Sequence, residues 1–176
     1  MEDGSPMRLT LFIFHPDGGP AFEVWAPREM RQVDAPQSAG ALVTEAPDGF
    51  APNLVVGHNR VSADMTLEAL TARLRDDAAA LPGAELQAGR TVAGTAGRVL
   101  TVAFTHAGRA DTGPLYQMTA CLLAPWPELS ERPGSIRQAP APDERDLIYL
   151  TGTCTVDQME TWDPAFLDAA CSVRFG

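Results

Sequence analysis

Three histidines offer the widest choice of chemistry in this 176-residue chain. His15, His58 and His106 each end or follow an apolar stretch with the composition of a β-strand. If the ends of these strands meet in the fold, the imidazoles can share a metal ion or relay protons. Their spacing matches no metal-ligand motif, so polar residues at strand ends are the preferred interpretation and we expect no metal site.

An acidic cluster precedes a strand near the C-terminal end of the chain, at Asp143, Glu144 and Asp146, and Asp111 lies in an earlier loop. Carboxylate oxygens are ligands for Ca²⁺ and Mg²⁺. The sequence lacks the glycine and carboxylate spacing of a calcium-binding loop. A solvated run of charge is therefore the simpler hypothesis.

Nucleophilic catalysis has equally little support. The strand-to-helix turn with flanking glycines that exposes a catalytic serine is absent around Ser62, Ser130, Ser135 and Ser172. Cys121 and His106 are separated by a loop and have no third group to orient them. We therefore predict no catalytic residue and no cofactor.

The cysteines Cys121, Cys154 and Cys171 have neither metal-ligand nor redox spacing. Buried cysteines acting as small hydrophobic side chains are the favoured interpretation. The less favoured alternative places Cys121 and Cys154 face to face on adjacent strands.

The composition excludes two classes of partner. The net charge is −10, and no cluster of lysine and arginine interrupts it, which argues against binding nucleic acid or an anionic membrane. No apolar window approaches the roughly 20 residues of a membrane span. The acidic start of the chain lacks the basic and apolar segments of a secretion signal, so we expect a cytoplasmic protein.

A helix at residues 66–81 is the clearest element, because Leu67, Leu70 and Leu74 recur at helical spacing before Pro82 and Gly83 end it. A second helix is predicted at 164–174, with Asp163 as N-cap, Pro164 in the first helical position and Trp162 stapled to Leu167. Strands are predicted at 9–15, 22–26, 32–34, 41–44, 53–56, 86–92, 98–106, 115–123 and 145–156.

The proline-rich segment 125–143 is predicted to be an exposed loop. Strands in succession with two helices indicate an α+β fold, an antiparallel sheet with helical cover. The strand at 115–123 alternates as if packed mainly on one side. We expect one domain over 1–176, in which 1–48 supply a hairpin and short strands and 49–176 the core.

The order of the core elements resembles the actinobacterial LpqN lipoprotein family, which is related to the DcrB proteins and the PsbP-like fold. The likeness covers roughly 49–175 and rests on the run Pro52 to Val56, the helix with Leu81-Pro82-Gly83, Gly97 to Leu100, Leu150 to Thr153 and the closing helix. It implies an α/β/α sandwich with a central antiparallel sheet. It also implies a protein-binding or accessory module without catalytic residues, such as a chaperone for a secreted or envelope partner. No cysteine precedes Cys121 to accept a lipid, so the envelope location is not carried over.

Aromatic residues are the candidate binding anchors. Trp126 lies between two prolines in the predicted loop, and Trp25 and Tyr149 lie in strands where one face can be open to solvent. Core packing is the alternative for each of them. Our leading hypothesis is a module that binds an unidentified protein partner, with the oligomeric state open and a homodimer among the options. The alternatives are a small-ligand or lipid carrier with a pocket between sheet and helix and, less favoured, an enzyme.

Overall fold

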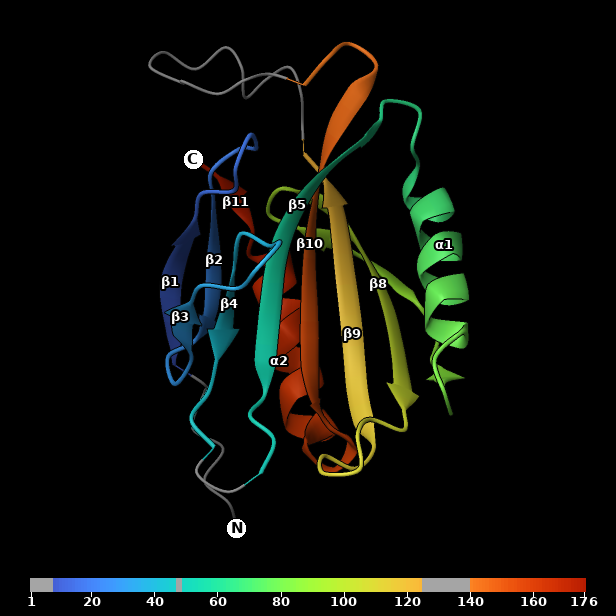
Figure 1. The fold of residues 1–176 in the computed structure, drawn as a ribbon. Helices are drawn as coiled ribbons and strands as arrows, with labels where there is room; N and C mark the ends of the chain where they lie inside the picture. Colours follow the sequence, from blue (N-terminus) through green and yellow to red (C-terminus); the bar gives the residue numbers. More distant parts are fainter. Residues whose placement is uncertain (1–7, 47–48, 125–139) are drawn as a thin grey trace.

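The structure is a computed structural model that describes residues 8–46, 49–124 and 140–176. Two antiparallel sheets and two helices build the fold (Figure 1). The three-stranded sheet is formed by β1 Leu9–Phe14, β2 Phe22–Pro27 and β11 Arg174–Phe175, in the order β1-β2-β11. No helix in the described part of the chain is both long and apolar enough to cross a membrane.

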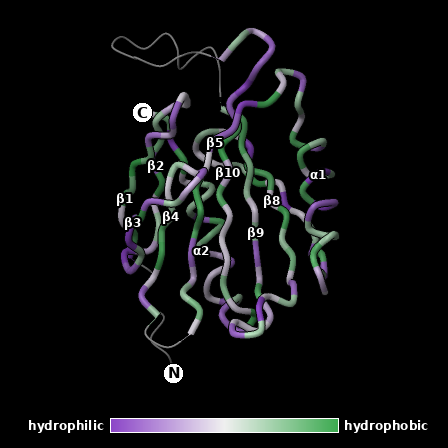
Figure 2. Tube along the Cα trace, viewed as in Figure 1, coloured by the Kyte–Doolittle hydropathy of each residue, from purple (hydrophilic) through white to green (hydrophobic). Residues whose placement is uncertain are grey.

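An eight-stranded sheet forms the centre of the fold, in the order β3-β4-β5-β10-β9-β8-β6, with β7 also paired to β8. Its strands are β3 Arg31–Val33, β4 Gly40–Val43, β5 Asn53–Ser62, β6 Glu85–Leu86, β7 Arg90–Gly94, β8 Gly97–His106, β9 Leu115–Leu123 and β10 Glu144–Thr155. The predicted strand at 86–92 is therefore two short strands. The hydropathy colouring shows apolar residues along the central strands (Figure 2).

The two faces of this sheet are covered differently. Helix α1, Leu67–Ala79, lies over β8 and β9 on one face, whereas α2, Met159–Cys171, and the three-stranded sheet cover the other (Figure 1). Each cover has its own core cluster, one around Phe14, Phe22 and Phe166 and a smaller one around Leu70 and Cys121. The predicted α+β sandwich around a central antiparallel sheet is confirmed, and the structure places one helix on each face of that sheet.

Helix α1 forms where the apolar spacing predicts it. Its N-cap is Thr66, whose side-chain oxygen accepts a hydrogen bond from the Ala69 N–H at 3.1 Å. Leu67 and Leu70 are buried, and the helix ends before Pro82. The prediction from helical periodicity is confirmed to within two residues at each end.

The predicted start of the second helix is wrong. Helix α2 begins at Met159, directly after a 3₁₀ turn at Val156–Gln158, and Pro164 lies inside it. Asp163 is not the N-cap, because it lies inside the helix, where its carboxylate accepts hydrogen bonds from Tyr116 and Arg90. Trp162 is likewise helical and lies beside Phe166, with 5.7 Å between ring centroids.

Two further predictions about strands are wrong. One concerns the length of β5, and the other concerns the packing of β9. Strand β5 continues to Ser62, so His58 lies within a strand and not at its end. Strand β9 buries Cys121 as well as Met118, so both of its faces are packed.

Cys121 and Cys154 do not face each other. Cys121 belongs to the cluster under α1 and Cys154 to the cluster under α2, so the two thiols lie on opposite faces of the sheet and are both free.

Glycine sets how closely α2 approaches the sheet. A Cβ atom on Gly152 would lie 2.3 Å from two ring carbons of Phe166, so that ring rests directly on the backbone of β10. Only a residue without a side chain allows this contact.

Candidate functional site

Trp25 lies on the outer face of the three-stranded sheet. Phe14, Phe22 and Val24 point inward to the core, and the alternation of side chains turns Trp25 outward, where it is 38% exposed. The register places Leu11 directly opposite Trp25 on β1.

Two further apolar side chains extend this surface along β1. Leu9 and Ile13 share the outer face with Leu11 and are 49% and 47% exposed, the highest values among the large apolar residues that the structure describes. We call the surface formed by Leu9, Leu11, Ile13 and Trp25 the Trp25 patch. Contiguous exposed apolar side chains are characteristic of surfaces that bind other proteins.

Ser172, next to the end of α2, holds the backbone of Trp25 in place. The Trp25 N–H donates to Ser172 Oγ at 2.8 Å, and the Ser172 hydroxyl lies 3.3 Å from the Trp25 carbonyl oxygen. The backbone polar groups of Trp25 therefore point away from β1. In an antiparallel pair this arrangement brings the two opposite side chains closer together, which favours packing of the Trp25 ring on Leu11.

Residue type singles out Trp25 in the sequence but does not single out Leu9 and Ile13. The run from Leu9 to Phe14 contains no charged residue and one polar residue. An edge strand with one solvated face normally alternates polar and apolar residues. The absence of that alternation was the available signal for an exposed apolar face.

Tyr149 lies on the other side of the molecule, on the face of the central sheet that carries α1. Its ring rests on Gly57 of β5, because a Cβ atom there would lie 2.1 Å from Tyr149 Cζ. Four half-buried residues beside Tyr149 are not covered by α1: Asn53, Val55, Thr151 and Thr153. We call them the open sheet face. The hydroxyl oxygen of Thr119 lies 3.2 Å from that of Thr151 at its border with β9.

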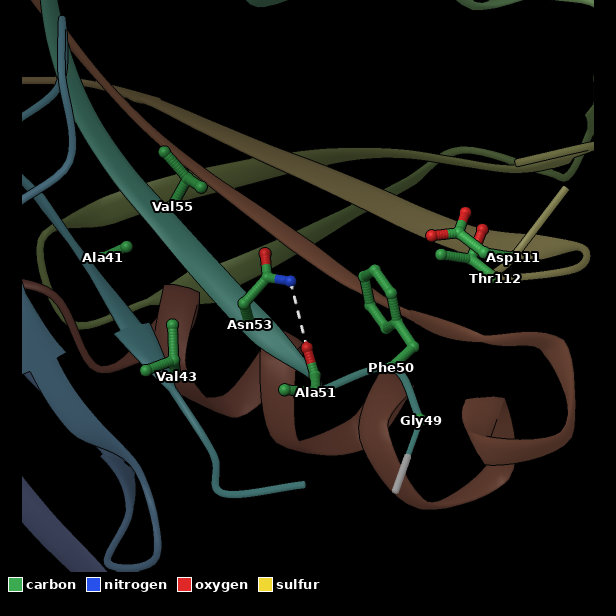
Figure 3. Close-up of a pocket in the computed structure, with 9 residues that line it drawn as sticks. All are labelled: Ala41, Val43, Gly49, Phe50, Ala51, Asn53, Val55, Asp111 and Thr112. Atoms are coloured by element: carbon green, nitrogen blue, oxygen red, sulfur yellow. Dashed lines mark hydrogen bonds between the residues drawn. The ribbon is translucent and has the colours of Figure 1, made fainter. Parts of the chain in front are cut away.

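Two hollows flank the open sheet face. One, of about 530 Å³, lies between β4, β5 and the turn at Asp111 and Thr112, with Phe50 and Asn53 in its wall (Figure 3). The other, of about 400 Å³, lies between α1 and the sheet and is lined by Leu70, Leu74, Tyr149 and other residues. The predicted space between sheet and helix is therefore present.

The remaining candidate anchor, Trp126, lies outside the described residues, as does most of the predicted loop at 125–143. The proposed role of Trp126 in binding stays a prediction.

The three histidines do not assemble into one site. His58 Nε2 lies 2.5 Å from Asp146 Oδ1, whereas His106 Nδ1 accepts a hydrogen bond from the Gly108 N–H at 3.2 Å. Within residues 8–46, 49–124 and 140–176, no group of three histidine, cysteine or carboxylate side chains is arranged to hold a metal ion. Asp146 is fully buried, so the interpretation of the acidic cluster as solvated charge is wrong for this residue.

A second polar cluster joins α2 to the sheet. The Tyr116 hydroxyl donates to Asp163 Oδ1, and Arg90 Nη2 donates to both Asp163 oxygens at 2.7 and 2.9 Å. Burial, together with the hydrogen bond to Asp163, raises the pKa of Tyr116 above its usual range. The phenol is therefore neutral at physiological pH and serves as a structural donor.

Two of the thiols, those of Cys121 and Cys154, are poor nucleophiles at neutral pH. Burial raises the pKa of Cys121 to about 12 and that of Cys154 to about 12. A buried thiol of this kind carries too little thiolate to attack a substrate.

Comparison with known structures identifies the fold. LpqN of Mycobacterium tuberculosis, described as involved in cell envelope biogenesis, matches with a TM-score of 0.66 at 12% sequence identity, over 94% of this chain and 90% of that one. This is an LpqN/PsbP-like fold. The cyanobacterial PsbP of Synechocystis sp. PCC 6803 matches with a TM-score of 0.57 at 15% identity, over 100% of this chain and 97% of that one.

The resemblance to the LpqN family and the PsbP-like fold that the sequence indicates is therefore confirmed at the level of the fold. No protein-family model and no curated protein matches the sequence. At 12 and 15% identity the two solved structures establish the fold and not the activity.

Proposed function

We propose that this chain is a non-enzymatic accessory protein that binds a partner protein through the Trp25 patch. The observation that carries the proposal is the exposure of Leu9, Ile13 and Trp25 on one face of a sheet held rigidly by the core beneath it. Tryptophan is enriched among residues that dominate binding energy, and a flat sheet presents it with little freedom to lose.

The partner is a protein with a mainly apolar contact surface. The four side chains of the patch are uncharged, but Glu23 lies opposite Ile13 on the same face and Arg174 lies opposite Glu23, so ionisable groups border the patch. We propose a chaperone-like role toward a secreted or envelope partner, supported by the description of the LpqN structure as an envelope biogenesis protein. A cytoplasmic site of action is part of this proposal.

Quantitative capture of partners from a lysate of the native organism tests the proposal. Tagged wild-type protein is compared with Trp25→Ala and with the matched control Leu86→Ala. Leu86 is a good control because it is also 38% exposed but lies on the edge strand β6, away from the patch. A partner that Trp25→Ala loses and Leu86→Ala retains supports the proposal. Equal recovery by all three proteins contradicts it.

The hollow beside α1 favours a second candidate function, a carrier of small apolar ligands. Its volume of about 400 Å³ falls within the range of small-molecule sites, and Leu70, Leu74 and Tyr149 supply apolar lining. Native mass spectrometry of the purified protein tests this function. An added mass that disappears when Leu74→Trp fills the hollow supports it, whereas a bare polypeptide mass from a fresh lysate contradicts it.

A further inference from the structure

Strand β1 is an edge strand whose outer backbone groups face away from the sheet. In the described residues β1 pairs with β2 alone. The Arg28 N–H donates to the Arg8 carbonyl at 2.9 Å, so Arg8 directs its backbone polar groups toward β2. Directions alternate along a strand, and Leu9, Leu11 and Ile13 therefore direct their N–H and C=O groups outward.

Two other hydrogen bonds support this assignment. Trp25 is opposite Leu11, and its N–H donates a hydrogen bond to Ser172 and not to β1. The Ile13 carbonyl accepts a hydrogen bond from Gln32 Nε2 at 3.3 Å, which requires that it point outward. This side-chain contact covers one end of the edge and leaves Leu9 and Leu11 without a backbone partner in the described chain.

The edge of β1 also lacks the features that prevent an edge strand from pairing with a strand of another molecule. Proteins protect such edges with charged residues, prolines or bulges, because an open edge pairs with other strands. The run Leu9–Phe14 contains no charged residue and no proline. Its register with β2 is continuous from Leu9 to Phe14, without a bulge. An uncharged edge is unusual in a chain with net charge −10.

We infer that two copies of this chain pair through β1. The occupant of this edge must itself be an uncharged strand with a free edge, and β1 of a second copy meets both conditions. Antiparallel pairing about Leu11 places Leu11 opposite its equivalent and Leu9 opposite Ile13 in both halves. The outward groups of Leu11 then meet as a hydrogen-bonded pair, and those of Leu9 meet those of Ile13 once the Gln32 side chain releases the Ile13 carbonyl.

The pairing joins the two small sheets into one and leaves their outer faces open. Strand addition covers the edge of a sheet and not its face, so both copies of Trp25 stay accessible beside the new seam. The inference therefore goes beyond the proposed function and does not depend on it.

Sedimentation velocity over a wide range of protein concentration tests the pairing. We expect the wild-type chain to pass from monomer to dimer, and added salt to shift it toward dimer because it screens the repulsion between two chains of charge −10. Leu11→Pro removes one outward N–H without breaking a bond to β2, and we expect it to stay monomeric. Leu11→Val keeps the N–H and should dimerise like the wild type.

Circular dichroism and thermal unfolding show whether Leu11→Pro retains the fold. If it does not, cysteine cross-linking decides the question without it. Leu11→Cys should form a disulfide-linked dimer on mild oxidation, because the register places residue 11 opposite itself. Residue 9 is more exposed than residue 11 but lies opposite Ile13, so Leu9→Cys should not cross-link.

The inference is overturned by a wild-type monomer at every concentration, by a dimer that Leu11→Pro leaves intact, or by cross-linking of Leu9→Cys equal to that of Leu11→Cys. A monomer that accepts a strand from a different protein also overturns it. The variant Trp25→Ala separates the two proposals, since it should lose the partner protein and keep the dimer.

Discussion

His58 and Asp146 form a buried pair between β5 and β10, with 2.5 Å between His58 Nε2 and Asp146 Oδ1. The turn of the β1–β2 hairpin covers this pair, since a Cβ atom on Gly19 would lie 2.7 Å from the imidazole ring. Arg60 adds a hydrogen bond from Nη2 to the Gly18 carbonyl at 2.9 Å. The hairpin that carries the Trp25 patch is thus fixed to the central sheet by polar contacts at its turn.

Replacing His58 should destabilise the protein strongly. His58→Ala leaves the Asp146 carboxylate buried without its nearest partner, and we expect the free energy of unfolding to fall by about 3 kcal/mol. Urea unfolding measures this change. Glu144→Gln is the matched control, because that carboxylate is 40% exposed and lies 3.7 Å from Arg60. It should cost less than about 1 kcal/mol, and equal losses in the two variants would refute the role of burial.

The contact between Tyr149 and Gly57 predicts a specific coupling. Gly57→Ala places a methyl group where the ring now lies, and we expect a loss of about 2 kcal/mol from the strain of displacing it. Tyr149→Ala removes the obstacle. In a double-mutant cycle measured by urea unfolding, the alanine at position 57 should therefore cost much less when Tyr149 is already absent. Additive losses would show that the two residues do not compete for the same space.

The raised pKa of Tyr116 predicts a loss of stability in alkaline solution. Burial is its main cause and the hydrogen bond to Asp163 the second. Tyr116 ionises in the unfolded chain near pH 10. The stability that the neutral phenol contributes is therefore complete below that pH and declines as the pH rises above it. Unfolding free energies should fall more steeply above about pH 10 for the wild type than for Tyr116→Phe. Parallel curves would contradict the assignment.

Thiol labelling should follow burial. Cys121 and Cys154 are buried and their pKa values are raised to about 12, whereas Cys171 is half-buried. Iodoacetamide at neutral pH should modify Cys171 first in the folded protein and all three cysteines at similar rates in urea. Peptide mass spectrometry reads out each site. Early modification of Cys121 would show that the cover formed by α1 opens readily.

Periodicity in the sequence was enough to predict α1, the β1–β2 hairpin and the sandwich architecture. It was misleading where distant residues decide the local structure. Asp163 and Pro164 have the appearance of a helix start, but Asp163 accepts hydrogen bonds from Tyr116 and Arg90, and α2 begins five residues before Pro164. Local sequence contains no information about such partners.

The candidate site was predictable to a similar extent. Trp25 and Tyr149 were identified by residue type, but the exposure of Leu9 and Ile13 depends on which face of β1 the core occupies. The sequence places His58 just after a strand because the apolar run that predicts the strand ends at Val56. Its partner, Asp146, is 88 residues away in the sequence. Only the register between β5 and β10 reveals that His58 has a buried carboxylate as its partner.

The position of Tyr149 on Gly57 also has a consequence for the entropy of association. A surface tyrosine normally gives up rotamer freedom when another molecule covers it, which weakens the complex. Here one side of the ring is already held against the backbone of β5, so much of that freedom is lost during folding. Any molecule that occupies the open sheet face meets an aromatic ring that is already immobilised and has a single side left to contact.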